Sequence, residues 1–190
     1  MQAVILAAGE GGRLRPLTRN RPKCLIPVAN SPILDYPIQA LAGCGIRDII
    51  VVVGYRKEHV IRYLDHLDFP VQVVEQKKQL GTADALLHAE PLIRDDFVVV
   101  PGDNYIDAES IAKVRDQPNA VLVKEHPYPS NFGVVIMKNN EVSCIIEKPD
   151  RAPSFVVSTG IFSFSRDFLS YVSGTDLTDS VNEMIRKGGH

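Results

Sequence analysis

The chain has 190 residues, of which 45% are hydrophobic and 23% are charged, a composition typical of one globular domain. Its formal net charge is only −2, so no global basic field indicates a nucleic-acid partner, and any anion site must be local. No apolar run approaches the roughly 18 residues that span a bilayer, so no membrane partner is expected.

The cysteines give no sign of a metal site or a disulfide framework. Cys24, Cys44 and Cys144 are widely spaced, odd in number and contain no CxxC pair. Each is expected to be a small buried hydrophobe with a free thiol, which suits a reducing compartment. Because the N-terminus also lacks a signal-peptide pattern, a cytoplasmic location is expected.

Short apolar runs and helical stretches alternate through the first half of the chain. Unbroken runs of Val and Ile, as in "DIIVVV", are typical of strands that are covered on both faces. This alternation predicts right-handed crossovers and a doubly wound α/β sheet. The predicted strands are Ala3–Ala7, Asp48–Val53, Phe97–Pro101 and Ala120–Val123, and the predicted helices are Ile33–Ala42, Lys57–His66 and one that begins with Thr82 as its N-cap.

The second half of the chain is richer in strands. The runs Phe132–Met137 and Val142–Glu147 flank "KNNE", which predicts a hairpin, and Phe155–Phe164 is a further predicted strand. Helices are predicted at Arg166–Val172 and Thr178–Lys187. We expect a small strand-rich extension on one α/β core, within a single domain that covers residues 1–190.

The loop after the first strand is unusually basic and rich in glycine. It reads "AAGEGGRLRPLTRNRPK" and lies at the carboxyl edge of the sheet, where such folds bind ligands. Glycines let backbone N–H groups approach phosphate oxygens, and Arg13, Arg15 and Lys23 supply positive charge. Leu14 breaks the dinucleotide pattern GxGxxG, and the P-loop motif is absent. A basic surface loop without a ligand is the alternative interpretation.

The spacing within this loop carries a family resemblance. "LAAGEGGRLRPLTRNRPKCLIPV" resembles the signature of sugar-1-phosphate nucleotidylyltransferases, although Gly12 stands where that family usually has Thr or Ser. Further segments resemble the family in the same order: "QKKQLGTADAL", "VVVPGDNY", "NFGVVIM", "IIEKP" and "VSTGIFSF". The resemblance covers almost the whole chain. It implies a Rossmann-like α/β/α nucleotidyltransferase fold with a mostly parallel central sheet and a small sugar-side extension.

The resemblance implies a reaction between a nucleoside triphosphate and a sugar 1-phosphate, which gives a nucleotide sugar and pyrophosphate. Two anions must approach each other, so catalysis requires charge neutralisation and positioning. The implied catalytic residues are Arg13 on the β- and γ-phosphates, Lys23 near the α-phosphate, Lys148 on the sugar phosphate, and Asp103 as a ligand of Mg²⁺. Read without the resemblance, an Asp after Gly is more often part of a turn or a helix cap than a metal ligand.

The implied binding residues fall into two sets. Gln76 carries both a donor and an acceptor and is expected to read the imide edge of uracil or thymine, with Gln79 as a second candidate. The nucleotide-binding set is Leu6, Ala8, Gly9, Gly11, Gly12, Gln76, Gly81 and Thr82. The sugar-binding set is Gly133, Glu147, Ser158 and Thr159, where Ser158 replaces an Asn found in some members.

The substrate pair and the assembly stay open at this stage. The resemblance favours dTTP with glucose 1-phosphate, followed by UTP with glucose or N-acetylglucosamine 1-phosphate, over a guanylyl enzyme for mannose 1-phosphate. A non-catalytic nucleotide-sensing or scaffold subunit is the alternative function, and a homo-oligomer is compatible with the sequence. The chain ends at "RKGGH", before the family's second metal ligand. We therefore expect the domain to lack its C-terminal end and this chain to have weak turnover.

Overall fold

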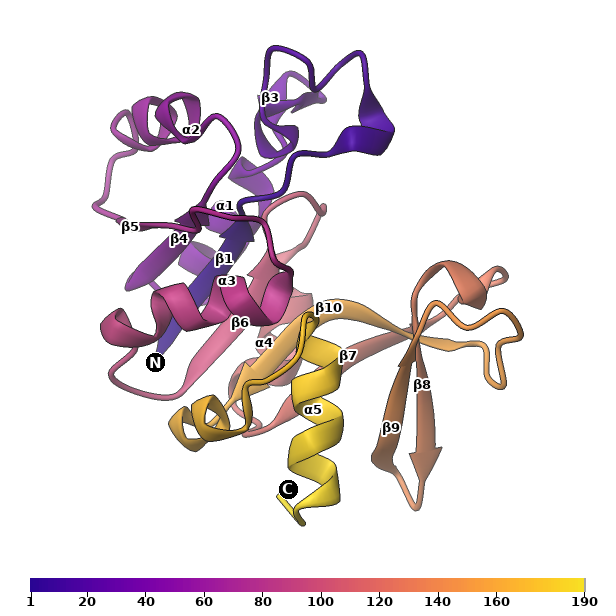
Figure 1. The fold of residues 1–190 in the computed structure, drawn as a ribbon. Helices are drawn as coiled ribbons and strands as arrows, with labels where there is room; N and C mark the ends of the chain where they lie inside the picture. Colours follow the sequence, from indigo (N-terminus) through magenta and orange to yellow (C-terminus); the bar gives the residue numbers. More distant parts are fainter. Residues whose placement is uncertain (190) are drawn as a thin grey trace.

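Figure 1 shows the computed structural model of the chain, which describes residues 1–189. One sheet runs through the molecule in the strand order β5-β4-β1-β6-β10-β8-β9, with β7 also paired to β10, and β2 pairs separately with β3. The strands are β1 (Gln2–Ala7), β2 (Pro27–Val28), β3 (Ser31–Pro32), β4 (Ile49–Val53), β5 (Gln72–Glu75), β6 (Phe97–Pro101), β7 (Ala120–Glu125), β8 (Gly133–Lys138), β9 (Glu141–Glu147) and β10 (Val156–Phe164).

The core of the sheet is parallel and fully buried. Strand β1 pairs in parallel with β4 on one side and β6 on the other, and β4 pairs in parallel with β5. Every residue of β4 is buried, as is nearly all of β1 and β6, because helices cover both faces. All these strands therefore end at one carboxyl edge, which confirms the predicted α/β fold.

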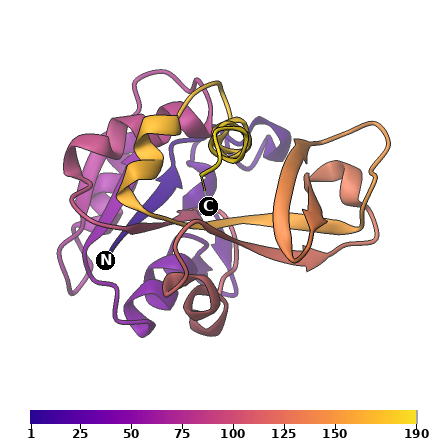
Figure 2. The same ribbon diagram turned by 90° about the horizontal axis from the view of Figure 1, so that it is seen from below.

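Helices cover the two faces in separate layers, as the two views in Figures 1 and 2 show. Helices α1 (Asp35–Gly43), α2 (Lys57–Leu64) and α4 (Ala108–Arg115) bury side chains against one face. Helices α3 (Thr82–Ala89) and α5 (Leu177–Arg186), with the 3-10 turn η5 (Arg166–Tyr171), cover the other face. Among residues 1–189, no helix is long and apolar enough to cross a membrane.

Strand β10 joins the parallel core to the strand-rich extension. Its C-terminal part pairs antiparallel with β6 and its N-terminal part with β8, while β7 pairs antiparallel with both parts. Phe164 anchors it in the core, stacking on Phe168 at a centroid distance of 3.6 Å and on Phe162 at 5.4 Å. The extension predicted from the sequence is therefore a continuation of the same sheet.

The β8–β9 hairpin forms where "KNNE" predicted it. Asn139 and Asn140 both have positive φ angles, 52° and 65°, which matches the twist of a two-residue hairpin turn. Helix α5 holds β9 from one face through Asn182, whose side chain accepts from Ile145 N at 2.8 Å and donates to Ile145 O at 2.7 Å. These paired bonds fix the extension against the core.

Several local features differ from the sequence-based expectation. Strand β5 and helix α4 were not predicted; α4 begins at the N-cap Asp107, whose carboxylate accepts from Ser110 N at 2.7 Å. Thr82 is the first residue of α3 rather than its N-cap, because Gly81 takes the N-cap position and the Thr82 hydroxyl bonds elsewhere. The segment that begins at Arg166 is a 3-10 rather than an α-helix.

Candidate active site

A cavity of about 450 Å³ lies at the carboxyl edge of the parallel strands, between the core and the extension. Its walls come from β1, β6, β8, β10 and the N-termini of α3 and α5. Most of the residues predicted for the site line it: Leu6, Ala8, Gly9, Gln76, Gly81, Thr82, Asp103, Gly133, Glu147, Lys148 and Ser158. These residues are distant in sequence, and the family resemblance predicted that they form one site. In the structure they line one cavity.

The glycine loop folds back on itself at the mouth of this cavity. Gly11 has φ +67°, and a Cβ added there would lie 2.8 Å from Lys23 Cβ, so only glycine allows this close approach. Thr18 closes the loop by donating its hydroxyl to Gly11 O at 3.0 Å. Gly11 and Gly12, which begins the turn η1 (Gly12–Leu14), belong to this loop and lie outside the cavity lining.

Opposite charges meet at the edge of the sheet. Lys23 forms an ion pair with Asp103, which is separated from the end of β6 by Gly102, and each side chain is about one-third exposed. Arg13 is exposed and lies outside the cavity lining, and no ion pair of Arg13 occurs within residues 1–189. Arg15 instead pairs with Glu10. The loop thus brings Lys23 to Asp103 and leaves the Arg13 guanidinium available for an anion.

Gln76 is the most buried polar residue that lines the cavity, with 3% of its surface exposed. Its backbone N donates to Val53 O at 2.8 Å, which fixes it at the end of β5. Its side-chain Nε2 donates to Gly81 O at 3.0 Å and to Asp84 Oδ2 at 2.7 Å. Both amide hydrogens are thus already used within the protein. The sequence-based expectation that Gln76 offers a ligand both a donor and an acceptor is therefore corrected, because only the acceptor oxygen is left.

The turn at Gly81, whose carbonyl also accepts from the Gln76 amide, contacts the segment that leads into α5. Gly81 has φ +112°, and a Cβ there would lie 2.1 Å from Thr175 O. Ala83 N donates to the same Thr175 O at 3.1 Å, and Thr82 Oγ1 accepts from Leu177 N at 2.9 Å. The N-termini of α3 and α5 are therefore held in direct contact beside the cavity.

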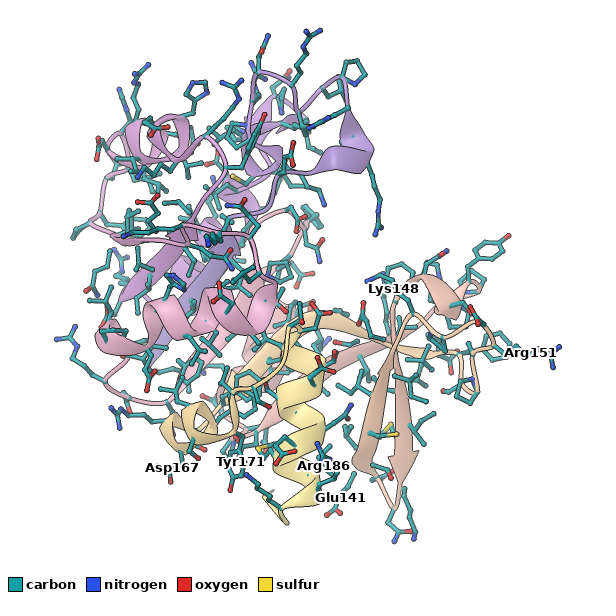
Figure 3. All side chains as sticks on the ribbon, in the orientation of Figure 1. Glu141, Lys148, Arg151, Asp167, Tyr171 and Arg186 are labelled. Carbon is teal, nitrogen blue, oxygen red and sulfur yellow. The ribbon has the colours of Figure 1, made fainter. Side chains whose placement is uncertain are left out.

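On the extension side, β8 and β9 present a bare backbone next to charged groups. A Cβ added at Gly133 would lie 3.2 Å from Glu147 Oε2, and Glu147 forms an ion pair with Lys148. Ser158 is nearly buried, and its Oγ accepts from Gly160 N at 3.1 Å. Figure 3 shows Lys148 at one end of the β8–β9 hairpin and Glu141 at the opposite end.

Thr159 and three missed residues differ from the sequence-based picture. The Thr159 hydroxyl donates to Leu122 O at 2.9 Å, and the residue lies outside the cavity lining. Asp176, Leu177 and Thr178 at the start of α5 line the cavity although they were not predicted there. Thr178 Oγ1 is buried and has no hydrogen-bond partner within residues 1–189. In the sequence these residues carry only the signal of a helix start, which is why their role was missed.

The acidic groups of the cavity suit a cation that is shared with a ligand. Within residues 1–189, no cluster of three or more His, Cys, Asp or Glu side chains could hold a metal by itself. Asp103 offers carboxylate oxygens at the mouth of the cavity, next to the cationic loop. Mg²⁺ commonly binds through one or two carboxylates, phosphates and waters, so this single carboxylate fits such an ion.

Curated relatives are similar along nearly the whole chain. The UTP--glucose-1-phosphate uridylyltransferase AglF of Haloferax volcanii is 39% identical over 175 residues, which cover 87% of this chain and 72% of AglF. The bifunctional protein GlmU of Methanococcus maripaludis is 35% identical over 199 residues, which cover 99% of this chain and 48% of GlmU. The chain thus spans about half the length of this relative.

Solved structures and a family model agree with these relatives. A Bacillus anthracis protein, assigned as a glucose-1-phosphate thymidylyltransferase and solved with sucrose, has a TM-score of 0.84 and 29% identity, covering 100% of this chain and 84% of its own. A UDP-glucose pyrophosphorylase complexed with UDP-glucose has the same fold, with a TM-score of 0.86, 21% identity and coverage of 98% and 87%. The model of the nucleotidyl transferase family matches residues 2–188. The chain therefore belongs to the nucleotidyl transferase family and is similar throughout to its sugar-1-phosphate nucleotidylyltransferases.

Proposed function

We propose that this chain is the nucleotidyl-transferring part of an enzyme that joins a hexose 1-phosphate to UTP or dTTP and releases pyrophosphate. The observation that carries the proposal is that the Gln76 amide, Asp103 and the Glu147–Lys148 pair line one cavity, and that Lys23, outside this lining, is ion-paired with Asp103. These groups match the base, the phosphates and the sugar phosphate of such a reaction.

The reaction needs positive charge more than it needs a covalent catalyst. An oxygen of the sugar phosphate attacks the α-phosphorus, a new P–O bond forms, and the bond to the β-phosphate oxygen breaks. Lys23 neutralises charge near the α-phosphate, and Arg13 takes charge on the departing pyrophosphate. Lys148 holds the phosphate of the attacking sugar and thereby reduces the repulsion between the two anions. The backbone at Gly9 and Gly11 approaches the phosphates closely.

Mg²⁺ is part of the proposal, with Asp103 as its protein ligand. The ion would supply charge neutralisation at the phosphates. Asp103 already faces the cationic loop in its pair with Lys23, so its carboxylate lies where phosphates are expected to bind. No second protein ligand is assigned.

The sugar side supports a hexose with free hydroxyls. Gly133 leaves space next to the Glu147 carboxylate, and Glu147 can accept hydrogen bonds from sugar hydroxyls. The unpartnered hydroxyl of Thr178 and the hydroxyl of Ser158 are further groups for this side of the cavity. The names of two relatives, a uridylyltransferase and a thymidylyltransferase, both refer to glucose 1-phosphate. Glucose 1-phosphate is therefore the first sugar to test.

The test is Mg²⁺-dependent release of pyrophosphate, measured with UTP, dTTP, CTP, GTP and ATP against glucose, N-acetylglucosamine and mannose 1-phosphates. We expect turnover with UTP or dTTP and a hexose 1-phosphate. Lys23→Ala should lower kcat by about 100-fold or more, as for loss of a group that stabilises developing charge. The matched control is Lys138→Ala, which removes an exposed lysine at the hairpin turn. Nucleotide binding without turnover in any pair, unchanged by Lys23→Ala, would instead support a sensor or scaffold subunit.

A further inference from the structure

The Gln76 carboxamide has a fixed orientation in this structure. Nε2 lies 3.0 Å from Gly81 O and 2.7 Å from Asp84 Oδ2. A carbonyl and a carboxylate are both obligate acceptors, so the nitrogen, and not the oxygen, must face them. Rotation of the amide by half a turn would place Oε1 against two acceptors. Asp84 and Gly81 therefore determine which end of the amide is left for a ligand.

Asp84 is well suited to hold this arrangement. It lies in the first turn of α3, where the helix dipole favours a carboxylate, and its side chain is 24% exposed. His88, one turn further along α3, places Nδ1 3.7 Å from Asp84 Oδ2. The bond to Gln76 is thus charge-assisted and stronger than a neutral amide contact. Gln76 itself is nearly fully buried, so water competes poorly for its amide hydrogens.

We propose that Asp84 is a positioning residue that selects the base by holding the Gln76 amide with its oxygen toward the cavity. An oxygen there accepts from a ring N–H, which uracil and thymine carry between their two carbonyl groups. Cytosine and adenine carry an unprotonated ring nitrogen at the equivalent place, so two acceptors would face each other. Sites built around a hydrogen bond strongly reject an analogue that cannot make it. Asp84 would thereby exclude cytosine without contacting any base.

This inference rests on the proposed function, because it assumes that Gln76 meets the base of a nucleotide. Its test is the ratio of the dissociation constants for CTP and UTP, measured by calorimetry so that turnover is not required. In the unaltered protein, UTP should bind more tightly than CTP. In Asp84→Asn, residue 84 can donate as well as accept, so only Gly81 O still opposes a turn of the Gln76 amide. The preference for UTP should fall by about tenfold or more.

Controls separate positioning from a general loss of structure. Glu58→Gln removes a matched carboxylate from the first turn of α2, away from the cavity, and should leave the ratio unchanged. Thermal unfolding reports whether Asp84→Asn is folded, and Asp84→Ser is measured in the same way if it is not. A merely structural role would weaken binding of both nucleotides equally and leave the ratio intact.

The outcomes are distinct. A reduced ratio in the Asp84 variants supports the inference. An unchanged ratio in folded variants overturns it while leaving the proposed function in place. Absence of binding by UTP, dTTP and CTP to the unaltered protein would contradict the proposed function, and the inference would fall with it.

Discussion

Replacement of Gly81 by alanine tests the contact that holds the two sides of the cavity together. Gly81 lies at φ +112° and ψ −177°, a backbone region that is essentially restricted to glycine. An added Cβ would also lie 2.1 Å from Thr175 O, which is backbone and cannot move aside as a side chain could. Gly81→Ala therefore combines backbone strain with a steric clash.

The expected cost follows from these two effects. Strain in this backbone region costs about 1–3 kcal/mol. Relief of the clash must shift the loop before α5, which endangers the bond from Ala83 N to Thr175 O and the bond from Leu177 N to Thr82 Oγ1. Each such bond contributes about 1 kcal/mol. We expect Gly81→Ala to lower the free energy of unfolding by about 3–5 kcal/mol.

Gly45→Ala is the matched control for this measurement. Gly45 also has a positive φ, +80°, but an added Cβ there meets nothing within 4 Å. Its replacement should cost about 1 kcal/mol from backbone strain alone. Urea denaturation of both variants measures the difference, which reports the clash together with the greater backbone strain at Gly81. Equal losses in the two variants would refute the reasoning, because the Gly81–Thr175 contact would then carry no energy.

Two further predictions concern buried or half-buried side chains. Thr159→Val should lower the free energy of unfolding by about 1 kcal/mol, because the bond to Leu122 O is lost. Thr178→Val should leave the free energy of unfolding unchanged or raise it, because the Thr178 hydroxyl has no partner within residues 1–189, but should weaken binding of the sugar phosphate. Denaturation and calorimetry on both variants check these effects, and sugar-phosphate binding that depends on Thr159 alone would contradict the prediction. Burial raises the pKa of the Cys24 thiol from 9.0 to about 12. Native Cys24 should therefore resist iodoacetamide at pH 8 and react only when the protein unfolds. The stability that depends on the neutral thiol should be lost as the pH rises from about 9 toward 12.

Much of the core was predictable because its strands are covered on both faces. Strands β1, β4 and β6 contain the unbroken apolar runs AVILA, IIVVV and FVVVP, and this pattern has few other interpretations. Strand β5 was missed because it is short and half-exposed, so its apolar pattern is weak. Helix α4 was missed because its signal is the N-cap Asp107 rather than a strong apolar period.

The candidate site was predictable where its chemistry is local in the sequence. The glycine loop, Asp103 after β6 and the Gln76–Gly81 segment each place their side chains through the strand that precedes them. The orientation of Gln76 was not predictable, because it depends on a side-chain contact with Asp84 that sequence patterns do not encode. The N-terminus of α5 lines the cavity because of long-range contacts with Gly81 and Thr82, and sequence patterns do not encode these contacts either.

The geometry of β10 explains why the cavity and the fold depend on each other. Near Phe162 this strand pairs with β6 of the core, and at Val157 it pairs with β8 of the extension. Its register against β7 shifts between Ser158 and Phe162, and Gly160, within this interval, has φ +80° and lies against Pro101. A bulge of this kind bends a strand and redirects its side chains. Ser158 and Gly160 consequently line the cavity at the place where the sheet passes from one side to the other. A change that straightened β10 would therefore separate Gln76 from Glu147 and Lys148 even if every side chain of the site were kept.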